Sequence, residues 1–372
     1  MPVPRMLAQD VEKASETNET FENKIQELPS IKLDPSLEGA TSLAFIGSCS
    51  EAESKKGVGD RKFVCGHGNG AITIFKCDAA TRQNPVQTLK LGSSSGLPIM
   101  KVLPHPTNPD LIFSASVDGN IYQSSITKHN TSIFHKEEGN EPMSLCFCDD
   151  VTVLISAGRD THVRMYDPVT NQITRAYHGS KTDRTSSSNS STCRPSKKVF
   201  ALKESPSHPH CFYSAGWDNS IKMWDCRTSE GVISSMSHKN SPHVCGDALD
   251  VKVCGGIGLE TILTASWTSK RALQLWEPNS DKLLRSVRFP SRKDDGEYLY
   301  SSRFVNDSVV VAGGSGSKDA VFINFHTSEP LLAVGSGSNP ITAIDNDVTT
   351  GLTLIGGTNY DVIHLTKTET AF

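Results

Sequence analysis

One pattern of hydrophobic and polar positions recurs seven times along the chain. In each copy an apolar run ends in small residues, a polar turn follows, and a second apolar run comes after the turn. Short runs separated by Gly, Asn, Asp and Ser are typical of β-strands, and no helical periodicity is sustained after the first thirty residues. The pattern predicts an all-β protein. Its copies read KFVCGHGNGAITIFK, LIFSASVDGNIYQSS, VLISAGRDTHVRMYD, CFYSAGWDNSIKMWD, ILTASWTSKRALQLWE, VVVAGGSGSKDAVFINF and LTLIGGTNYDVIHLT.

The spacing of these copies indicates seven structural repeats. The small residue before each turn is Gly66, Ser116, Gly158, Gly216, Ser266, Gly314 and Gly357, so successive copies are 50, 42, 58, 50, 48 and 43 residues apart by subtraction. A repeat of four short strands needs about 40 to 45 residues, so the longer spacings predict surface insertions. A further apolar run precedes most copies, such as TSLAF at 41 and PIMKVL at 98, and is interpreted as the innermost strand.

The end of the third strand carries the most specific motif. Trp224-Asp225 ends the second apolar run of the fourth copy, Tyr166-Asp167 stands there in the third, and Trp276-Glu277 in the fifth. The chain resembles the WD-repeat family over about residues 30–368. The resemblance implies one domain with the fold of a seven-bladed β-propeller.

The last copy has too little sequence after it for a fourth strand. We expect Ser30–Leu33 to supply that strand from the amino terminus and so to close the ring. Residues 1–29 are expected to lie outside the ring, as an acidic tail or as a short helix with Phe21, Ile25 and Leu28 on one face. Residues 179–198 form a Ser-rich basic insertion and are interpreted as a loop.

The resemblance implies a buried hydrogen-bond set that stiffens a blade. Such groups would bond to each other rather than face a substrate, so no catalytic residue is expected among them. The set in the fourth unit is His178, Ser214, Asp218 and Trp224, and a weaker copy in the third is His135, Ser156, Asp160 and Tyr166.

The resemblance also implies a partner-binding face. In the family, the residue just before each turn carboxylate points to the rim of the central channel. Here these residues include Val117, Arg159 and Trp217, with Trp267 as the counterpart in the fifth unit. Trp and Arg often dominate the binding energy of interfaces. The alternative is that either Trp packs beneath its own loop.

Residues 224–227 suggest a second surface. Trp224, Asp225 and Arg227 resemble the box by which propeller receptors dock onto the adaptor of cullin-RING ubiquitin ligases, with Arg227 carrying the contact. The alternative is that Arg227 makes an ordinary surface ion pair.

Composition narrows the classes of partner. A net charge of -4 gives no general attraction to nucleic acid or to anionic membranes, so the expected partners are one or more proteins or peptides. The ten cysteines have neither the spacing of a disulfide framework nor that of a zinc site, so reduced thiols and no metal are expected. The first residues contain no apolar signal segment, and no window is apolar enough for a membrane span, which favours the cytoplasm, the nucleus or both.

These features favour a non-catalytic scaffold, or an adaptor subunit of a multiprotein complex, that needs no cofactor and takes no small-molecule substrate. Two alternatives stay open at this point. One alternative is a substrate receptor of a cullin-RING ubiquitin ligase. The other is a propeller hydrolase of the esterase kind, although no residue stands out as a nucleophile.

Overall fold

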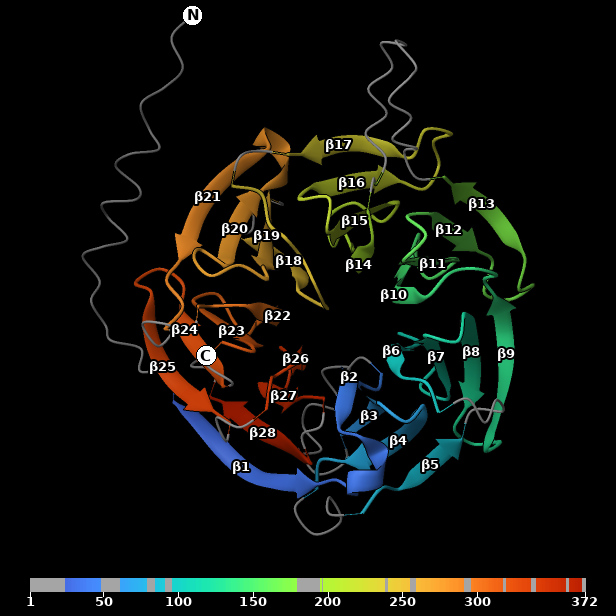
Figure 1. Ribbon diagram of the computed structural model, residues 1–372, viewed down its shortest axis with the longest axis horizontal. Helices are drawn as coiled ribbons and strands as arrows, with labels where there is room; N and C mark the ends of the chain where they lie inside the picture. Colours follow the sequence, from blue (N-terminus) through green and yellow to red (C-terminus); the bar gives the residue numbers. More distant parts are fainter. Residues whose placement is uncertain are drawn as a thin grey trace, which may run out of the picture.

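Seven four-stranded antiparallel sheets surround a central axis in the computed structural model (Figure 1). The structure describes residues 24–47, 61–78, 84–90, 96–178, 195, 197–237, 240–254, 259–290, 296–316, 319–335, 339–358 and 361–369. Each sheet is one blade, and the expected seven-bladed propeller is confirmed.

The strands of each blade follow one another outward from the axis (Figure 1). Blade 1 contains β2 (Ala40–Phe45), β3 (Lys62–His67), β4 (Ala71–Lys76) and β5 (Gln87–Lys90). Blade 2 contains β6 (Ile99–Pro104), β7 (Leu111–Ser116), β8 (Asn120–Ser125) and β9 (Asn130–Lys136). Blade 3 contains β10 (Pro142–Cys148), β11 (Val153–Gly158), β12 (Val163–Tyr166) and β13 (Ile173–Tyr177). Blade 4 contains β14 (Val199–Glu204), β15 (Cys211–Gly216), β16 (Ile221–Asp225) and β17 (Val232–Met236).

The remaining blades repeat this order. Blade 5 contains β18 (Leu249–Cys254), β19 (Leu259–Ala265), β20 (Leu273–Glu277) and β21 (Lys282–Val287). Blade 6 contains β22 (Leu299–Phe304), β23 (Val309–Gly314), β24 (Ala320–Asn324) and β25 (Glu329–Val334). Blade 7 contains β26 (Ala343–Asp347), β27 (Leu352–Gly356), β28 (Val362–Thr368) and β1 (Ile25–Lys32). The 3-10 helices η1 (Pro35–Leu37) and η3 (Pro278–Ser280) are the helical segments among the described residues, and neither is long and apolar enough to cross a membrane.

The two ends of the chain meet in blade 7, which closes the ring (Figure 1). Strand β1 pairs antiparallel with β28, with Ile25 opposite Thr368 and Ile31 opposite Ile363. The closing strand begins at Ile25, five residues earlier than Ser30, so the expectation that residues up to 29 lie outside the ring is wrong for residues 25–29. Ile25 and Leu28 pack in this strand rather than on a helical face, while Phe21 and the rest of the tail lie outside the described residues.

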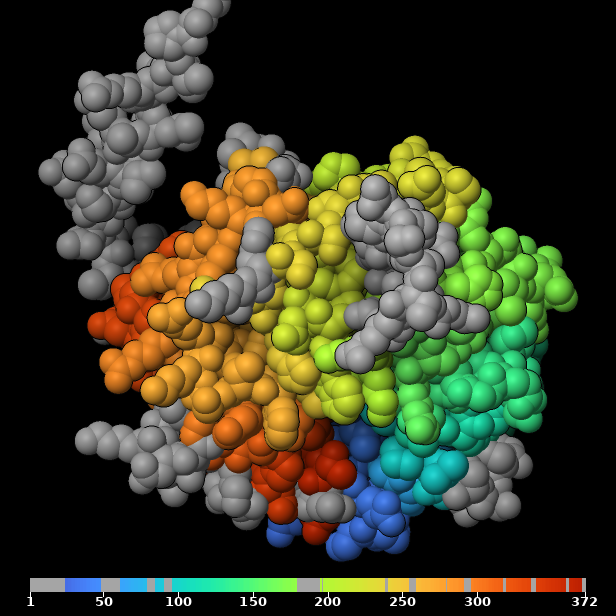
Figure 2. Space-filling view, turned by 45° about the horizontal axis from the view of Figure 1, so that its top comes forward, coloured from blue at the N-terminus to red at the C-terminus, as the bar shows by residue number. Residues whose placement is uncertain are grey.

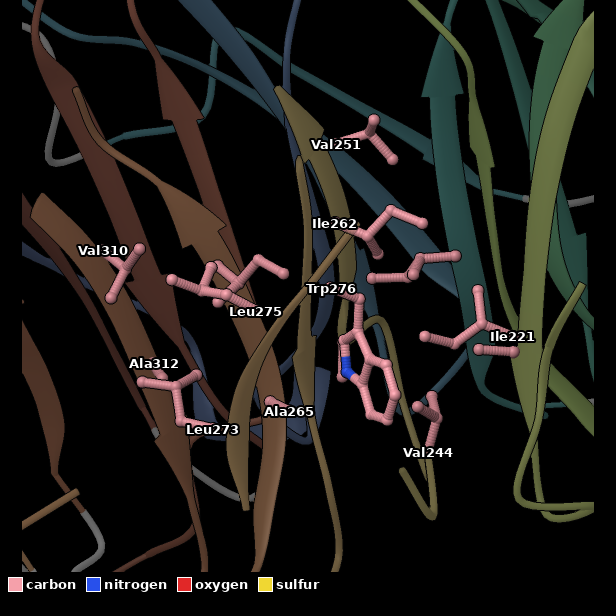
Figure 3. Close-up of a cluster of buried hydrophobic side chains, with 14 of the residues drawn as sticks. Ile221, Val244, Val251, Ile262, Ala265, Leu273, Leu275, Trp276, Val310 and Ala312 are labelled. Atoms are coloured by element: carbon pink, nitrogen blue, oxygen red, sulfur yellow. The ribbon is translucent and has the colours of Figure 1, made fainter. Parts of the chain in front are cut away.

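The hydrophobic side chains fill the space between adjacent blades. Trp276 of β20 is fully buried, and its indole lies beside Ile221 of blade 4 and Val244 (Figure 3). Leu273 and Leu275 of the same strand lie on its other side, toward Val310 and Ala312 of blade 6 (Figure 3). Alternation along β20 therefore joins blade 5 to both of its neighbours.

Close backbone approach explains the small residue before the turn. A Cβ atom at Gly158, Gly216 or Gly314 would lie 2.1 Å from the carbonyl oxygen of the residue just before the inner strand of the same blade. At Gly357 the distance to the nearest carbonyl oxygen would be 2.0 Å. Any larger residue at these four positions would push the second strand away from the first.

Charged side chains on or just before the inner strands meet near the axis. Lys101 Nζ of β6 lies 2.6 Å from Asp247, and Arg303 of β22 contacts the same carboxylate and lies 3.6 Å from Asp345 of β26. Burial opposes ionisation of Asp247, but Arg303 and Lys101 hold its pKa well below the usual value. Blades 2, 5, 6 and 7 are thus linked through charges as well as through their apolar interfaces.

His67 at the end of β3 is a buried imidazole within blade 1. Its Nδ1 lies 2.8 Å from the carbonyl oxygen of Gly39 and its Nε2 lies 2.7 Å from Thr73 Oγ1. The Gly39 carbonyl can only accept, so Nδ1 donates, and in the neutral ring Nε2 then accepts from the Thr73 hydroxyl. Burial lowers the pKa of His67 to about 4.

Truncation of the closing strand tests the role of β1. Ile31→Ala should lower the free energy of unfolding by about 3 kcal/mol, because the fully buried side chain leaves a cavity opposite Ile363. Urea denaturation measures the change, with Gln26→Ala at an exposed position of the same strand as the control. Equal stability of the two variants would contradict the assignment of β1 as a packed strand.

The neutral state of His67 predicts a pH dependence of stability. The unfolded chain binds a proton near pH 6.5 and the folded chain only near pH 4, so stability should fall as the pH drops through this window, by roughly 3 kcal/mol. His67→Gln should flatten the pH profile of the unfolding free energy, measured in urea from pH 7 to 4.5. Replacement of the exposed His178 by Gln serves as the control, and an unchanged profile in His67→Gln would refute the prediction.

Candidate protein-binding face

The turns between the second and third strands place the expected partner-binding residues on one face of the ring. The backbone N–H groups of Val117, Arg159 and Trp217 donate to the carbonyls of Pro98, Glu141 and Lys198, at 3.1, 3.1 and 3.0 Å. Each acceptor is the residue immediately before the inner strand of its blade. The same hydrogen bond in blades 2, 3 and 4 therefore brings all three side chains to the same end of the sheets.

Trp217 lies in a group of aromatic and cationic side chains. Its ring stacks on His243 with centroids 5.9 Å apart and an interplanar angle of 13°, and it packs at 5.3 Å against Phe200 of β14. Lys198 Nζ lies 5.1 Å from the ring centroid, within the range of a cation–π contact. The side chain is partly buried, so the alternative of a Trp that packs around its own loop describes much of its surface.

Trp267 is the more exposed of the two tryptophans. It is 44% exposed, which is unusual for the residue type with the largest apolar surface. Its ring packs at 5.3 Å against Tyr298, which precedes β22 of blade 6. Its backbone N–H donates to the carbonyl oxygen of His243 over 2.9 Å.

His243 connects the two tryptophans. Its ring stacks on Trp217, its carbonyl accepts from Trp267, and its Nδ1 lies 2.6 Å from the side-chain oxygen of Asn219. We call Phe200, Trp217, His243, Trp267 and Tyr298 the aromatic row. It runs over blades 4, 5 and 6, and blades 4 and 5 adjoin in one continuous surface in the space-filling view (Figure 2).

Arg159 and Val117 lie on the same face but in blades 3 and 2. The Arg159 guanidinium is paired with the Glu141 carboxylate, and more than half of its side chain is exposed. Sequence reasoning missed Phe200, His243 and Tyr298, because they precede or begin inner strands and carry no motif of their own. In the folded ring each of them lies next to a turn residue of its own blade or of the adjacent blade. The sequence alone does not show this proximity.

The hydrogen-bond set expected in blade 4 is formed only in part. Trp224 Nε1 donates to Ser214 Oγ over 2.8 Å, and both groups are buried. Asp218 instead pairs with Lys222 and accepts from Ser220 Oγ at 2.8 Å. His178 is exposed and packs edge-on against His162 at 4.8 Å, so the structure does not bring it to Ser214.

A buried glutamate replaces histidine in the weaker copy of the set. Glu137 accepts from Tyr166 Oη at 2.7 Å and from Ser156 Oγ, and Arg164 lies 3.1 Å from its other oxygen. Burial, and then the Glu137 carboxylate, raise the pKa of Tyr166, so the phenol stays a donor. His135 packs against the Tyr166 ring at a tilt of 53°, with centroids 4.9 Å apart, and Asp160 pairs with Arg164 and His162.

A comparison with protein families matches the same two units. The model described as WD domain, G-beta repeat fits residues 129–167 and 187–225, which include the third strands of blades 3 and 4. Together with the seven blades, this match decides the family. The chain is a WD-repeat β-propeller. No curated protein matches the chain.

The possible ligase-docking box of this WD-repeat propeller is engaged within its own turn. Asp225 accepts from Arg227 through Nε at 3.0 Å, through a terminal guanidinium nitrogen at 2.7 Å, and through the backbone N–H at 2.9 Å. Trp224 is fully buried. The geometry matches the alternative interpretation, an ordinary ion pair, although the Arg227 side chain is still 61% exposed.

One further group in the WD-repeat propeller has the composition of a catalytic triad. Ser205 Oγ lies 2.5 Å from Glu260 Oε1 and 3.3 Å from His208 Nδ1, between blades 4 and 5. A nucleophilic serine needs a histidine as its base, with the acid behind the histidine. Here the Ser205 hydroxyl is bonded directly to the acid, and its oxygen accepts from the backbone N–H of His208 at 3.1 Å. The arrangement is that of a structural turn.

Loss of the buried carboxylate tests the hydrogen-bond set of blade 3. Glu137→Ala should lower the free energy of unfolding by about 3 kcal/mol, because Arg164 loses a buried partner and Tyr166 and Ser156 lose their acceptor. Glu138→Ala is the matched control, since that side chain is 79% exposed. Chemical denaturation distinguishes the two, and equal losses would contradict a central role of Glu137.

Proposed function

We propose that this WD-repeat propeller is a non-catalytic scaffold whose aromatic row binds a segment of a partner protein. The observation that carries the proposal is the row itself, in which Trp267 is 44% exposed between His243 and Tyr298. WD-repeat propellers are in general platforms for protein interaction. The propeller holds the row on turns anchored to inner strands, so binding orders few side chains.

The surroundings of the row indicate the chemistry of the partner. Lys198 lies over Trp217, and Lys270 and Arg271 are exposed in the turn that follows Trp267. Arg159 lies on the same face in blade 3. We infer that the partner segment carries a large apolar side chain for Trp267 and acidic residues beside it.

The role of substrate receptor for a cullin-RING ligase receives no separate support. Arg227 already binds Asp225 through Nε and one terminal nitrogen of its guanidinium, and docking would have to replace or share this pair. An esterase function is favoured by no group among the described residues: the Ser214 hydroxyl is bonded to Trp224 inside blade 4, and the Ser205 hydroxyl to Glu260 between blades 4 and 5. We therefore keep the scaffold as the single proposal, with adaptor as its more specific form.

Replacement of Trp267 tests the proposal. Trp267→Ala should weaken binding of a partner at least about 30-fold, since an anchor of this kind contributes 2 kcal/mol or more. Affinity purification of the full-length chain followed by mass spectrometry identifies proteins that are lost from the variant, and calorimetry with each purified protein gives the dissociation constants.

Val169→Ala is the matched control, because Val169 is 88% exposed and lies in a turn at the opposite face. A thermal melt shows that both variants fold. The proposal fails if every partner of the wild-type chain binds Trp267→Ala with unchanged affinity.

A further inference from the structure

Three separate segments meet between blades 3 and 4, at the face opposite the aromatic row. They are Cys148–Asp149 at the end of the inner strand β10, Pro209–His210 before β15, and Cys226 after β16. Asp149 donates its N–H to the Pro209 carbonyl over 2.7 Å, and Cys226 donates its N–H to the His210 carbonyl over 2.9 Å. The Cys148 thiol also reaches the Pro209 carbonyl, at 3.3 Å. Backbone bonds therefore fix the three segments relative to one another.

The side chains of these segments converge. A carboxylate oxygen of Asp149, a ring nitrogen of His210 and Sγ of Cys226 all lie within 4.8 Å of one another. The His210 Nδ1 closely contacts the Asp149 carboxylate. This nitrogen is buried, and within the described part of the chain it has no partner with the geometry of a hydrogen bond. The Cys148 thiol is the next donor, in contact with Cys226.

The cationic side chains around the group are engaged elsewhere. The Arg175 guanidinium binds the carbonyls of Cys226 and Thr228 at 2.6 and 2.8 Å rather than the thiols. Arg227, the residue after Cys226, pairs with Asp225. Two thiols, an imidazole and a carboxylate therefore converge with no lysine or arginine side chain bonded to them among the described residues.

We propose that Asp149, His210 and Cys226, with Cys148 as the fourth ligand, form a zinc site that joins blade 3 to blade 4. Thiolate, imidazole and carboxylate are the ligand types of zinc, and four of them satisfy its tetrahedral geometry. Ligand atoms around a tetrahedral zinc are about 3.5 Å apart, given bond lengths of about 2.0 to 2.3 Å. The ligand atoms of Asp149, His210 and Cys226, all within 4.8 Å of one another, need only small side-chain movements to reach this separation, and Cys148 would turn its thiol from the Pro209 carbonyl toward them. Binding releases the two thiol protons to solvent.

Titration of the purified full-length chain with Zn²⁺ alone tests the site. The chain is kept reduced with a phosphine, and a chromophoric chelator competes for the metal. We expect one equivalent of zinc in the wild type. Cys226→Ser and His210→Ala should each lower the affinity for zinc. The loss should exceed the roughly 10- to 100-fold decrease that follows when a residue that only hydrogen-bonds to a metal ligand is removed. Replacement of zinc by Co²⁺ should add thiolate-to-cobalt absorption bands that Cys226→Ser loses.

Two matched control variants replace a cysteine and a histidine that lie outside the proposed site. Cys245→Ser removes a partly buried thiol near the other face, and His208→Ala removes a histidine two positions from His210. Both should bind zinc like the wild type. Zinc at a hundred times its dissociation constant should also reduce the unfolded fraction of the wild type about a hundredfold, and leave that of His210→Ala unchanged.

Three outcomes overturn the proposal. The first is the absence of stoichiometric zinc in the reduced wild type. The second is equal affinity in Cys226→Ser and Cys245→Ser. The third is a Cys148–Cys226 disulfide in the chain as isolated, together with no zinc uptake after reduction. If Cys226→Ser fails to fold, Asp149→Asn replaces it, because this carboxylate is about one-third exposed and the amide has the same shape.

Discussion

The antiparallel pairing of β1 with β28 is the interaction on which the rest of the structure depends. A row of blades in sequence would leave an unpaired edge on the last sheet and an uncovered apolar face at each end. The segment before the first blade supplies the outer strand of the last one, so every blade has two neighbours. The contact of Asp247 with Lys101 depends on the same closure, since it joins blade 5 to blade 2 across the axis.

Stiffness is achieved differently in different blades. In blades 4 and 5 an indole donates to a hydroxyl on the neighbouring strand, as Trp276 does to Thr264 at 3.1 Å. In blade 3 a phenol, a hydroxyl and a guanidinium share the carboxylate of Glu137. In blade 1 an imidazole, His67, bridges a carbonyl and a threonine. These solutions have one requirement in common, which is that each buried polar group finds a partner inside the blade.

The two faces of the ring offer different chemistry. One face presents the aromatic row, where large apolar rings lie beside cations and are suited to a peptide with an apolar anchor. At the other face thiol, imidazole and carboxylate groups converge between two blades. A zinc ion there would stabilise the scaffold without touching the binding face, because the strands of blades 3 and 4 separate the two sites.

The sequence by itself determined the number of blades, their order and the closure by an amino-terminal strand. These follow from a local pattern, since each apolar run and turn is legible within about fifteen residues and the glycines are required by contacts within one blade. It also placed Val117, Arg159 and Trp217 at equivalent turn positions. The start of β1 at Ile25 was missed because its pairing partner lies at the far end of the chain.

Only the tertiary structure decided which side chains meet. His178 matched the motif by position but lies on the surface, and Glu137 matched no motif but occupies the centre of a buried set. His243 joins two tryptophans that are fifty positions apart. The proposed ligands Asp149, His210 and Cys226 have no metal-site spacing, because they lie next to the ends of different strands of adjacent blades. A contact across a blade interface joins residues that are far apart in the chain, so a local run of residues does not reveal it.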